Sequence, residues 1–355
     1  MKTNQSIDTT KPMLVTGGSG YVASWIIKTL LEKGFAVRTT VRNKIDIDKY
    51  KHLLKLAKYS KGTLEIFEAD LLISGSYSDA MKDCELIFHT ASPFKIAGIK
   101  NPQTDLIDPA LQGTRNVLFS ANATPAVKRI VLTASVATIY GDAIEIEQTK
   151  NGLFTEEDWN KTSNLKHHPY SYSKTIAEKE AWKIAGEQEQ WDLVTVHPGF
   201  VLGPSLTKRN DSTSIDLMIS ILNGKYKMGV PDMYFGIIDV RDVALIHVAS
   251  GITPAAIGRY IAVSGSMGML EMANILRKEY PNNNKIPKTT LPKFLLYLFG
   301  PTQGFSWKFI RNNLGISVQF DNSRSREELG INYHTIEQTL VDHTEQIIRD
   351  KLIKL

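Results

Sequence analysis

Short apolar runs rich in β-branched residues alternate with longer amphipathic stretches over the first half of the chain. This alternation is typical of a parallel sheet wrapped by helices. Right-handed crossovers would bring the carboxyl ends of the strands to one edge, where such sheets bind their ligands. The predicted strands cover residues 13–16, 35–41, 64–68, 85–90, 129–133 and 192–197, and the predicted helices cover residues 22–33, 103–121 and 170–186.

The pattern loses its regularity after Pro198. Glycine, proline and serine interrupt residues 199–236, and a strand-like run follows only at residues 259–264. Two further helices are predicted over residues 270–279 and 336–352. We therefore expect an α/β fold, a doubly wound parallel sheet over residues 1–198 with segments near 237–266 returning to it. A smaller C-terminal lobe over residues 199–236 and 267–355 would cover the ligand edge.

The composition of the chain argues against several classes of function. With 42% apolar and 22% charged residues the chain resembles an ordinary soluble protein, and no apolar run approaches the roughly 18–20 residues that span a bilayer. The net charge of +5 is spread along the chain, so we expect no nucleic-acid partner and no membrane partner. The single cysteine, Cys84, excludes an intrachain disulfide and offers no cysteine-based metal site. We expect a cytoplasmic protein.

A glycine-rich turn joins the first strand to the first helix, in the sequence Leu14-Val15-Thr16-Gly17-Gly18-Ser19-Gly20-Tyr21-Val22-Ala23. Gly17 permits a tight turn, Gly20 lets the backbone approach a pyrophosphate, and small Ala23 allows the helix to pack closely on the strand. The free N–H groups and the helix dipole would then face the phosphates. A purely structural turn is the alternative, but its position after the first strand favours a Rossmann-type dinucleotide site. The predicted contacts are Thr16, Gly17, Ser19, Gly20, Tyr21 and Val22.

The end of the second strand indicates which coenzyme binds. NAD sites usually carry an acidic residue there, whereas this chain has Arg42 and no acid before Asp46. A guanidinium suits a 2′-phosphate, so we predict NADPH, with Arg42 as the main contact and Arg38 as a helper. The alternative is that both arginines are merely exposed charges. After the third strand, Asp70 and Leu71 would border the adenine, or Asp70 would cap a helix.

Tyr170 and Lys174 have the spacing that places two side chains on one face of a helix. A nearby ammonium would lower the tyrosine pKa, making the phenol a proton donor at neutral pH. Ser135 follows the fifth strand and would hold a substrate carbonyl, although a satisfied loop serine is the alternative. Tyr172 faces away and is expected to pack. Taken alone, the tyrosine–lysine spacing is common.

Together these features resemble the extended short-chain dehydrogenase/reductase family, and within it the dihydroflavonol-reductase-like group with its yeast-type and bacterial aldehyde and ketone reductases. Further similar segments are Phe88-His89-Thr90-Ala91-Ser92-Pro93-Phe94, Gly113-Thr114-Arg115-Asn116-Val117-Leu118 and His197-Pro198-Gly199-Phe200-Val201-Leu202-Gly203-Pro204. The resemblance implies a catalytic triad of Ser135, Tyr170 and Lys174. It also implies cofactor contacts from Thr90, Ala91, Ser92, Pro198, Gly199, Val201 and Ser205. The cinnamoyl-CoA reductase signature Asn-Trp-Tyr-Cys-Tyr is replaced by His167-His168-Pro169-Tyr170, so we expect no lignin-type CoA substrate.

The predicted function is NADPH-dependent reduction of a small aldehyde or ketone to an alcohol by a monomer or homodimer. Phe94, Tyr234 and Phe235 would line an apolar substrate pocket, or else pack between the lobes. A nucleotide-sugar epimerase or dehydratase and a non-catalytic NADP sensor are the alternatives; Arg42 argues against the first and the Tyr170–Lys174 pair against the second. No metal is predicted, because His167 and His168 have no supporting ligand cluster in the sequence.

Overall fold

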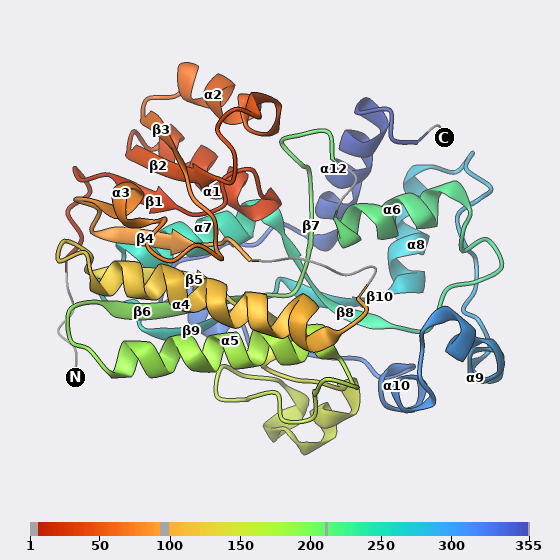
Figure 1. Cartoon of the computed structure of the whole chain (residues 1–355). Helices are drawn as coiled ribbons and strands as arrows, with labels where there is room; N and C mark the ends of the chain where they lie inside the picture. Colours follow the sequence, from red (N-terminus) through yellow and green to blue (C-terminus); the bar gives the residue numbers. More distant parts are fainter. Residues whose placement is uncertain (1–5, 93–98, 210–211, 354–355) are drawn as a thin grey trace.

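The computed structural model describes residues 6–92, 99–209 and 212–353. Within these residues, seven parallel strands form the main sheet in the order β3-β2-β1-β4-β5-β6-β9 (Figure 1). The predicted doubly wound parallel sheet is confirmed, and the carboxyl ends of its strands share one edge. The strands are β1 (Met13–Val15), β2 (Ala36–Val41), β3 (Thr63–Glu68), β4 (Leu86–His89), β5 (Arg129–Thr133), β6 (Asp192–Pro198) and β9 (Gly258–Ala262).

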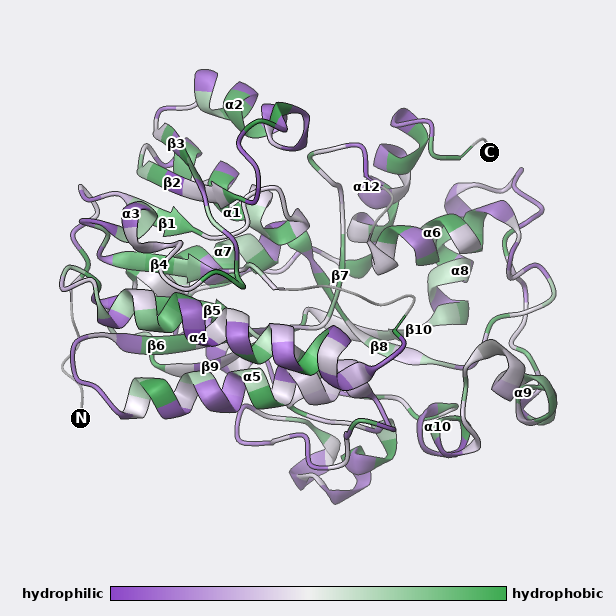
Figure 2. Cartoon of the chain, viewed as in Figure 1, coloured by the Kyte–Doolittle hydropathy of each residue, from purple (hydrophilic) through white to green (hydrophobic). Residues whose placement is uncertain are grey.

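Helices cover both faces of this sheet. Met13 and Val15 of β1 pack in the cluster that contains α1 (Tyr21–Glu32) and α7 (Val240–Ile252), whereas Leu14 packs in the cluster of α4 (Asp108–Asn122) and α5 (Pro169–Gly186). Alternate residues of a strand point to opposite faces, so a strand buried on both sides reads as a continuous apolar run. Figure 2 shows β1 and β4 largely in green, whereas the helices are of mixed colour. Shorter helices α2 (Lys51–Lys58) and α3 (Ser78–Met81) complete this part.

The C-terminal lobe contains a small second sheet that the sequence pattern did not predict. Its order is β10-β8-β7, with β7 (Phe200–Leu202) parallel and β10 (Gly265–Gly268) antiparallel to β8 (Tyr234–Asp239). The lobe core unites this sheet with α6 (Thr213–Asn223), α8 (Met269–Glu279) and α12 (Ile336–Arg349). Three further helices are α9 (Lys293–Phe299), α10 (Trp307–Asn313) and α11 (Ser323–Glu327).

The chain passes between the two parts more than once. Of the segment near 237–266, α7 and β9 pack with the main sheet, while the strands on either side of them belong to the small sheet. Asp239 at the end of β8 accepts a bond of 2.9 Å from Thr339 of α12 and forms an ion pair of 2.7 Å with Arg241. No helix in the part of the chain that the structure describes is long and apolar enough to cross a membrane.

Candidate active site

The glycine-rich turn is shaped by close backbone contacts. Gly17 has a φ of +70°, a conformation that favours glycine, and its N–H donates to Thr40 Oγ1 at 3.0 Å. A Cβ at Gly18 would lie 2.2 Å from Thr39 Oγ1, so no larger residue fits there. The amide of Gly20 bonds back to the Gly17 carbonyl at 2.9 Å. Thr39 and Thr40, which sequence reasoning did not single out, thus hold the turn in place.

The turn opens directly into the N-terminus of α1. Gly20 is the N-cap, no side chain caps this end, and the first turn of α1 carries no acidic residue. The first N–H groups of a helix have no partner within the helix and carry the positive end of its dipole. This end of α1 therefore suits an anionic group.

Thr16 links the ends of β1 and β4. Its hydroxyl accepts from the amides of Thr90 at 3.1 Å and Ala91 at 3.0 Å, and it bonds the ring of buried His89 at 3.1 Å. Burial lowers the pKa of His89 to about 3, so the ring is neutral. Of the predicted cofactor residues, Thr16, Gly17, Thr90 and Ala91 are therefore neighbours, and Ser92 follows them as an exposed residue.

A segment remote in sequence closes over the start of α1. The Tyr21 hydroxyl donates to the Gly203 carbonyl at 2.5 Å, and the Trp25 indole donates to the Pro204 carbonyl at 2.8 Å. The predicted contact Ser205 follows, buried, with its amide bonded to Gln346 of α12. Arg209 lies 6.0 Å from the Tyr21 ring, which brings a cation near this helix end. Nothing in the local sequence indicated Arg209.

The two arginines of β2 have different environments. Arg42 follows the strand as an exposed residue, and it makes no hydrogen bond or ion pair with other residues that the structure describes. Arg38 instead bonds Glu65 at 3.1 Å and the carbonyls of Ala80 and Lys82. The predicted helper role of Arg38 therefore does not fit, because its guanidinium already holds β2 to β3 and to the segment before β4.

The residues predicted to border the adenine form a turn after β3. Asp70 Oδ1 accepts from the amide of Leu72 at 2.8 Å, as expected for an Asx turn. The Leu71 carbonyl accepts from Asn116 at 2.7 Å, and a Cβ at Gly113 would lie 3.3 Å from the Leu71 Cβ. These contacts hold the β3 end against α4.

Ser135, Tyr170 and Lys174 come from two elements in contact. Ser135 lies two residues beyond β5, half-buried, and its Oγ accepts from the amide of Ala137 at 3.2 Å. Tyr170 and Lys174 lie one turn apart at the start of α5, and Pro169 occupies the first helical position, where its missing N–H costs nothing. Lys174 Nζ donates to the Thr133 carbonyl at 3.3 Å, which brings the lysine to the end of β5.

Burial sets the ionisation of this pair. It raises the pKa of Tyr170 to about 12 and lowers that of Lys174 to about 8, against a smaller raising effect of Glu178. The expected lowering of the Tyr170 pKa by Lys174 is therefore not observed, because desolvation disfavours the phenolate. A neutral phenol keeps its proton at physiological pH, which suits a proton donor.

The residues predicted to flank the nicotinamide lie where the chain passes from β6 to β7. The Gly199 amide donates to the Ala262 carbonyl at 3.0 Å, and a Cβ there would lie 2.3 Å from the Gly236 carbonyl oxygen. Pro198 and Val201 flank this contact on β6 and β7. His197 beside them is fully buried and bonds Thr195 and Thr138, so it is a core residue, as predicted.

The predicted substrate residues separate to two sides of β8. Tyr234 packs in an apolar cluster with Ile139, Tyr140, Phe154 and Phe320, and Ile139 lies four residues beyond Ser135. Phe235 stacks on Phe200 with ring centroids 5.1 Å apart, within the lobe core. Phe235 thus favours the packing alternative. Phe94 lies outside the described residues.

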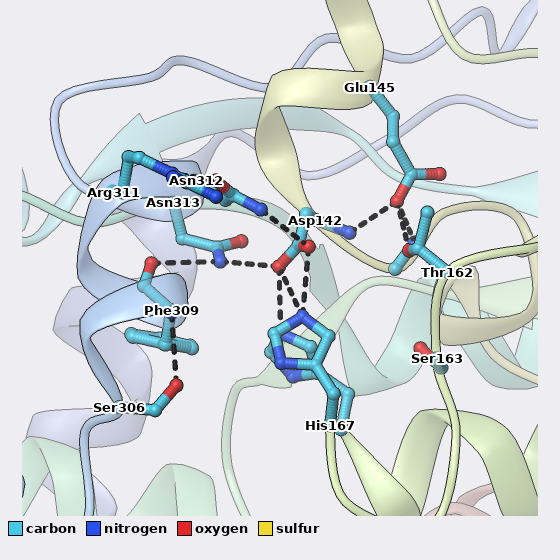
Figure 3. A network of polar contacts seen from close by, with 12 residues as sticks. Asp142, Glu145, Thr162, Ser163, His167, Ser306, Phe309, Arg311, Asn312 and Asn313 are labelled. Atoms are coloured by element: carbon cyan, nitrogen blue, oxygen red, sulfur yellow. Dashed lines mark hydrogen bonds and ion pairs between the residues drawn. The ribbon is translucent and has the colours of Figure 1, made fainter.

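His167 and His168, just before α5, both bond Asp142, and Figure 3 shows His167 beside this carboxylate. Their ligand atoms lie within 4.8 Å of one another, a spacing that a metal ion can bridge. The buried carboxylate nevertheless already accepts from both imidazoles and from the amides of Asn312 at 3.0 Å and Asn313 at 2.8 Å. We interpret this group, the Asp142 hub, as a junction that joins α10 to the segment before Tyr170.

A parallel sheet with an uncapped glycine-rich turn at its carboxyl edge defines a dinucleotide-binding protein of the Rossmann type. A model of the NAD dependent epimerase/dehydratase family matches residues 13–258. The chain belongs to this family, the extended short-chain dehydrogenases/reductases, and is an oxidoreductase, which confirms the family that its sequence resembles.

Relatives of this chain are reductases. Cinnamoyl-CoA reductase CAD2 of Medicago truncatula is 39% identical over 274 residues, covering 76% of this chain and 80% of that protein. Gre2 of Candida albicans, solved in complex with NADPH, is 30% identical and covers 96% of this chain and 99% of its own, with a TM-score of 0.78. Yeast methylglyoxal/isovaleraldehyde reductase Gre2, complexed with NADPH, is 26% identical over 95% of this chain and 98% of its own, with a TM-score of 0.78.

Proposed function

We propose that this protein uses NADPH to reduce the carbonyl group of a small apolar or aromatic aldehyde or ketone. The observation that carries the proposal is that Lys174, one turn from Tyr170 on α5, reaches the Thr133 carbonyl at the end of β5, two residues before Ser135. Both parts of the reaction, coenzyme binding and proton donation, then use the same edge.

The coenzyme would lie along this edge with its pyrophosphate at the N-terminus of α1. The tight glycine turn and the uncapped helix end fit phosphate groups, and Gly17, Ser19, Gly20, Tyr21 and Val22 would contact them. Arg42, exposed at the end of β2, would bind the 2′-phosphate through charge-assisted hydrogen bonds. The complexes of both Gre2 proteins with NADPH support this choice.

NADPH, when bound, supplies the hydride. Ser135 and Tyr170 would donate hydrogen bonds to the carbonyl oxygen, where negative charge develops, and Tyr170 would transfer its proton to that oxygen. Lys174, charged below a pKa of about 8, would stabilise the phenolate that remains. Pro198, Gly199 and Val201 would flank the nicotinamide, and Ser205 would approach the phosphates or ribose from the segment over α1.

The substrate would meet aromatic side chains. Tyr140 stacks on Phe154 with ring centroids 4.7 Å apart, and Tyr234 belongs to the same cluster. This cluster includes Ile139, four residues after Ser135 in the sequence. Such a surface favours apolar carbonyl compounds over charged sugars.

We expect Tyr234→Ala to raise KM about tenfold, while Phe235→Ala lowers the melting temperature without a specific effect on KM. Steady-state kinetics and calorimetry of the two variants check this difference.

A panel assay tests the proposal. NADPH consumption would be followed with aldehydes, ketones, cinnamoyl-CoA and a UDP-sugar as substrates. We expect turnover of apolar aldehydes or ketones, and little of the thioester, since His167 and His168 replace the cinnamoyl-CoA reductase signature. Turnover of the UDP-sugar without reduction of any carbonyl compound would instead establish the epimerase alternative. No turnover despite tight NADPH binding would favour a sensor.

A further inference from the structure

Helices α9 and α10 lie at one corner of the molecule (Figure 1), and both carry exposed apolar side chains. Phe294, Leu298 and Trp307 are each 67% exposed, and Tyr297 and Phe299 are also exposed. These five side chains, the α9–α10 patch, lie within 14 residues of sequence. Large apolar side chains gathered on a surface usually mark an interaction site, whereas single exposed ones need no explanation.

The helices that carry the patch pack against one another and on a small core. On the inner side, Leu296 of α9 packs with Ile310 and Leu314 in a small core. On the outer side, the Trp307 indole donates to the Tyr297 carbonyl at 3.1 Å, which joins α10 to α9. The inner face of α9 is therefore covered by this core, whereas its exposed apolar side chains take no part in the core.

The segment of the chain that carries the patch has charges of one sign. Residues 280–320 contain no Asp or Glu but carry five cations, and all five are exposed: Lys285, Lys288, Lys293, Lys308 and Arg311. Exposed Met228 lies next to Gly229, which packs against Leu291 two residues before α9, and exposed Lys225 and Lys227 lie beside Met228 in the sequence. The half-buried Asp232 contacts Gly315 in the same segment, and its negative charge is outnumbered by these cations.

We propose that the α9–α10 patch docks on the surface of an anionic lipid bilayer. Tryptophan, phenylalanine and leucine flanked by lysines are the composition that inserts into the boundary between lipid headgroups and acyl chains. Anionic headgroups attract the surrounding lysines. This peripheral contact needs no helix that spans the bilayer, although the sequence alone led us to expect no membrane partner. The proposal does not depend on the catalytic assignment.

A second copy of the chain is the main competing occupant. A two-fold symmetric dimer through this patch would place the same cations of both copies face to face. That repulsion disfavours self-association, whereas the same cations strengthen binding to an anionic surface. The charge pattern therefore selects lipid over a second copy.

Co-sedimentation of the full chain with vesicles tests the proposal. We expect binding to vesicles that contain phosphatidylserine to exceed binding to pure phosphatidylcholine vesicles by at least tenfold, and to weaken as salt rises. Phe294→Ser with Leu298→Ser should reduce binding at least tenfold. The matched control, Phe119→Ser with Ile257→Ser, removes side chains that are 52% and 59% exposed elsewhere and should bind like the unmutated protein.

A second variant, which removes two positive charges and no apolar side chain, tests the proposal without disturbing the fold. Lys288→Gln with Lys308→Gln leaves the apolar residues in place and should weaken binding to the anionic vesicles about fivefold per removed cation. Unchanged melting temperatures establish that each variant is folded. The proposal is overturned if the protein ignores phosphatidylserine, if neither pair of substitutions changes binding, or if sedimentation equilibrium without lipid finds a dimer that Phe294→Ser with Leu298→Ser dissociates.

Discussion

The carboxyl edge of the main sheet and the C-terminal lobe organise their residues in different ways. At the edge, Gly17 follows β1 and Ser135 follows β5, while Tyr170 and Lys174 lie in the first two turns of one helix, α5. In the lobe, remote segments meet through buried polar groups, as Asp142 meets Asn312 and Asn313 from 170 residues further along.

This contrast predicts that mutations in the two regions have different effects. Side chains at the edge project from a backbone that the sheet already fixes, so their removal should change chemistry or coenzyme choice more than folding. The polar junctions hold the lobe in place, so their removal should first lower stability. Variants in each region can test this separation.

Removing the proposed proton donor should have the largest effect. Tyr170→Phe is expected to lower kcat about 100-fold or more, the scale of general-acid catalysis, while NADPH affinity and melting temperature stay nearly constant. Tyr172→Phe, two positions along the same helix, serves as the control and should stay within a few-fold of the unmutated rate. The reverse ranking in steady-state kinetics would refute the assignment of Tyr170.

Arg42 should decide the choice of coenzyme. One charge-assisted contact with the 2′-phosphate is worth about 1.5–3 kcal/mol, so we expect NADPH to bind roughly 10- to 150-fold more tightly than NADH. Arg42→Ala should remove most of this preference by weakening NADPH alone, as measured by calorimetry. Lys55→Ala removes an exposed charge from α2 and should leave the preference intact. Equal affinity of the unmutated protein for both coenzymes would contradict the role of Arg42.

The Asp142 hub tests the lobe side of the comparison. Burial raises the Asp142 pKa, but hydrogen bonds from His168, Asn312 and Asn313 outweigh it and hold the pKa well below its usual value. Asp142→Asn cannot accept from all four donors and should cost about 2–4 kcal/mol of unfolding free energy. Because the folded pKa is depressed, this stabilisation is present above about pH 4 and lost as the pH falls further.

Denaturation of Asp142→Asn beside Asp48→Asn measures this cost. Asp48 is 84% exposed and pairs with Lys51, so its substitution should leave the unfolding free energy nearly unchanged. Equal stabilities of the two variants would mean that the Asp142 hub does not hold the lobe.

The pH dependence of reduction should follow Lys174. Its pKa is lowered to about 8, so the ammonium is present below that pH and lost above it, whereas Tyr170, with a pKa of about 12, stays protonated. We expect kcat to be level below pH 8 and to fall about tenfold per pH unit above it. Tyr172→Phe should keep the same profile. A rate that stays level up to pH 10 would exclude a charged Lys174 from the rate-limiting step.

The sequence predicted the main sheet well because its signals are local. Strand runs, the glycine turn and the spacing of Tyr170 and Lys174 can each be read within about ten residues. Burial could not be read in this way, so the sequence suggested a lowered Tyr170 pKa where desolvation raises it.

The lobe was predicted poorly because its contacts are remote. The strands of the small sheet are three to six residues long and lie among loops, and nothing near Asp142 pointed to Asn312 or Asn313. Arg209 likewise approaches Tyr21 from a distant loop. The opposite directions of Tyr234 and Phe235 follow from strand alternation, once β8 is known to be a strand.

The central claim is net reduction, and a stoichiometric measurement tests it most directly. Purified protein would be incubated with limiting NADPH and an excess of an apolar aldehyde, and the coenzyme and alcohol would both be quantified. We expect the alcohol formed to equal the NADPH consumed, and the reaction to stop in Tyr170→Phe. Conversion of a nucleotide sugar with no net change in coenzyme, and no alcohol from the aldehyde, would contradict the account.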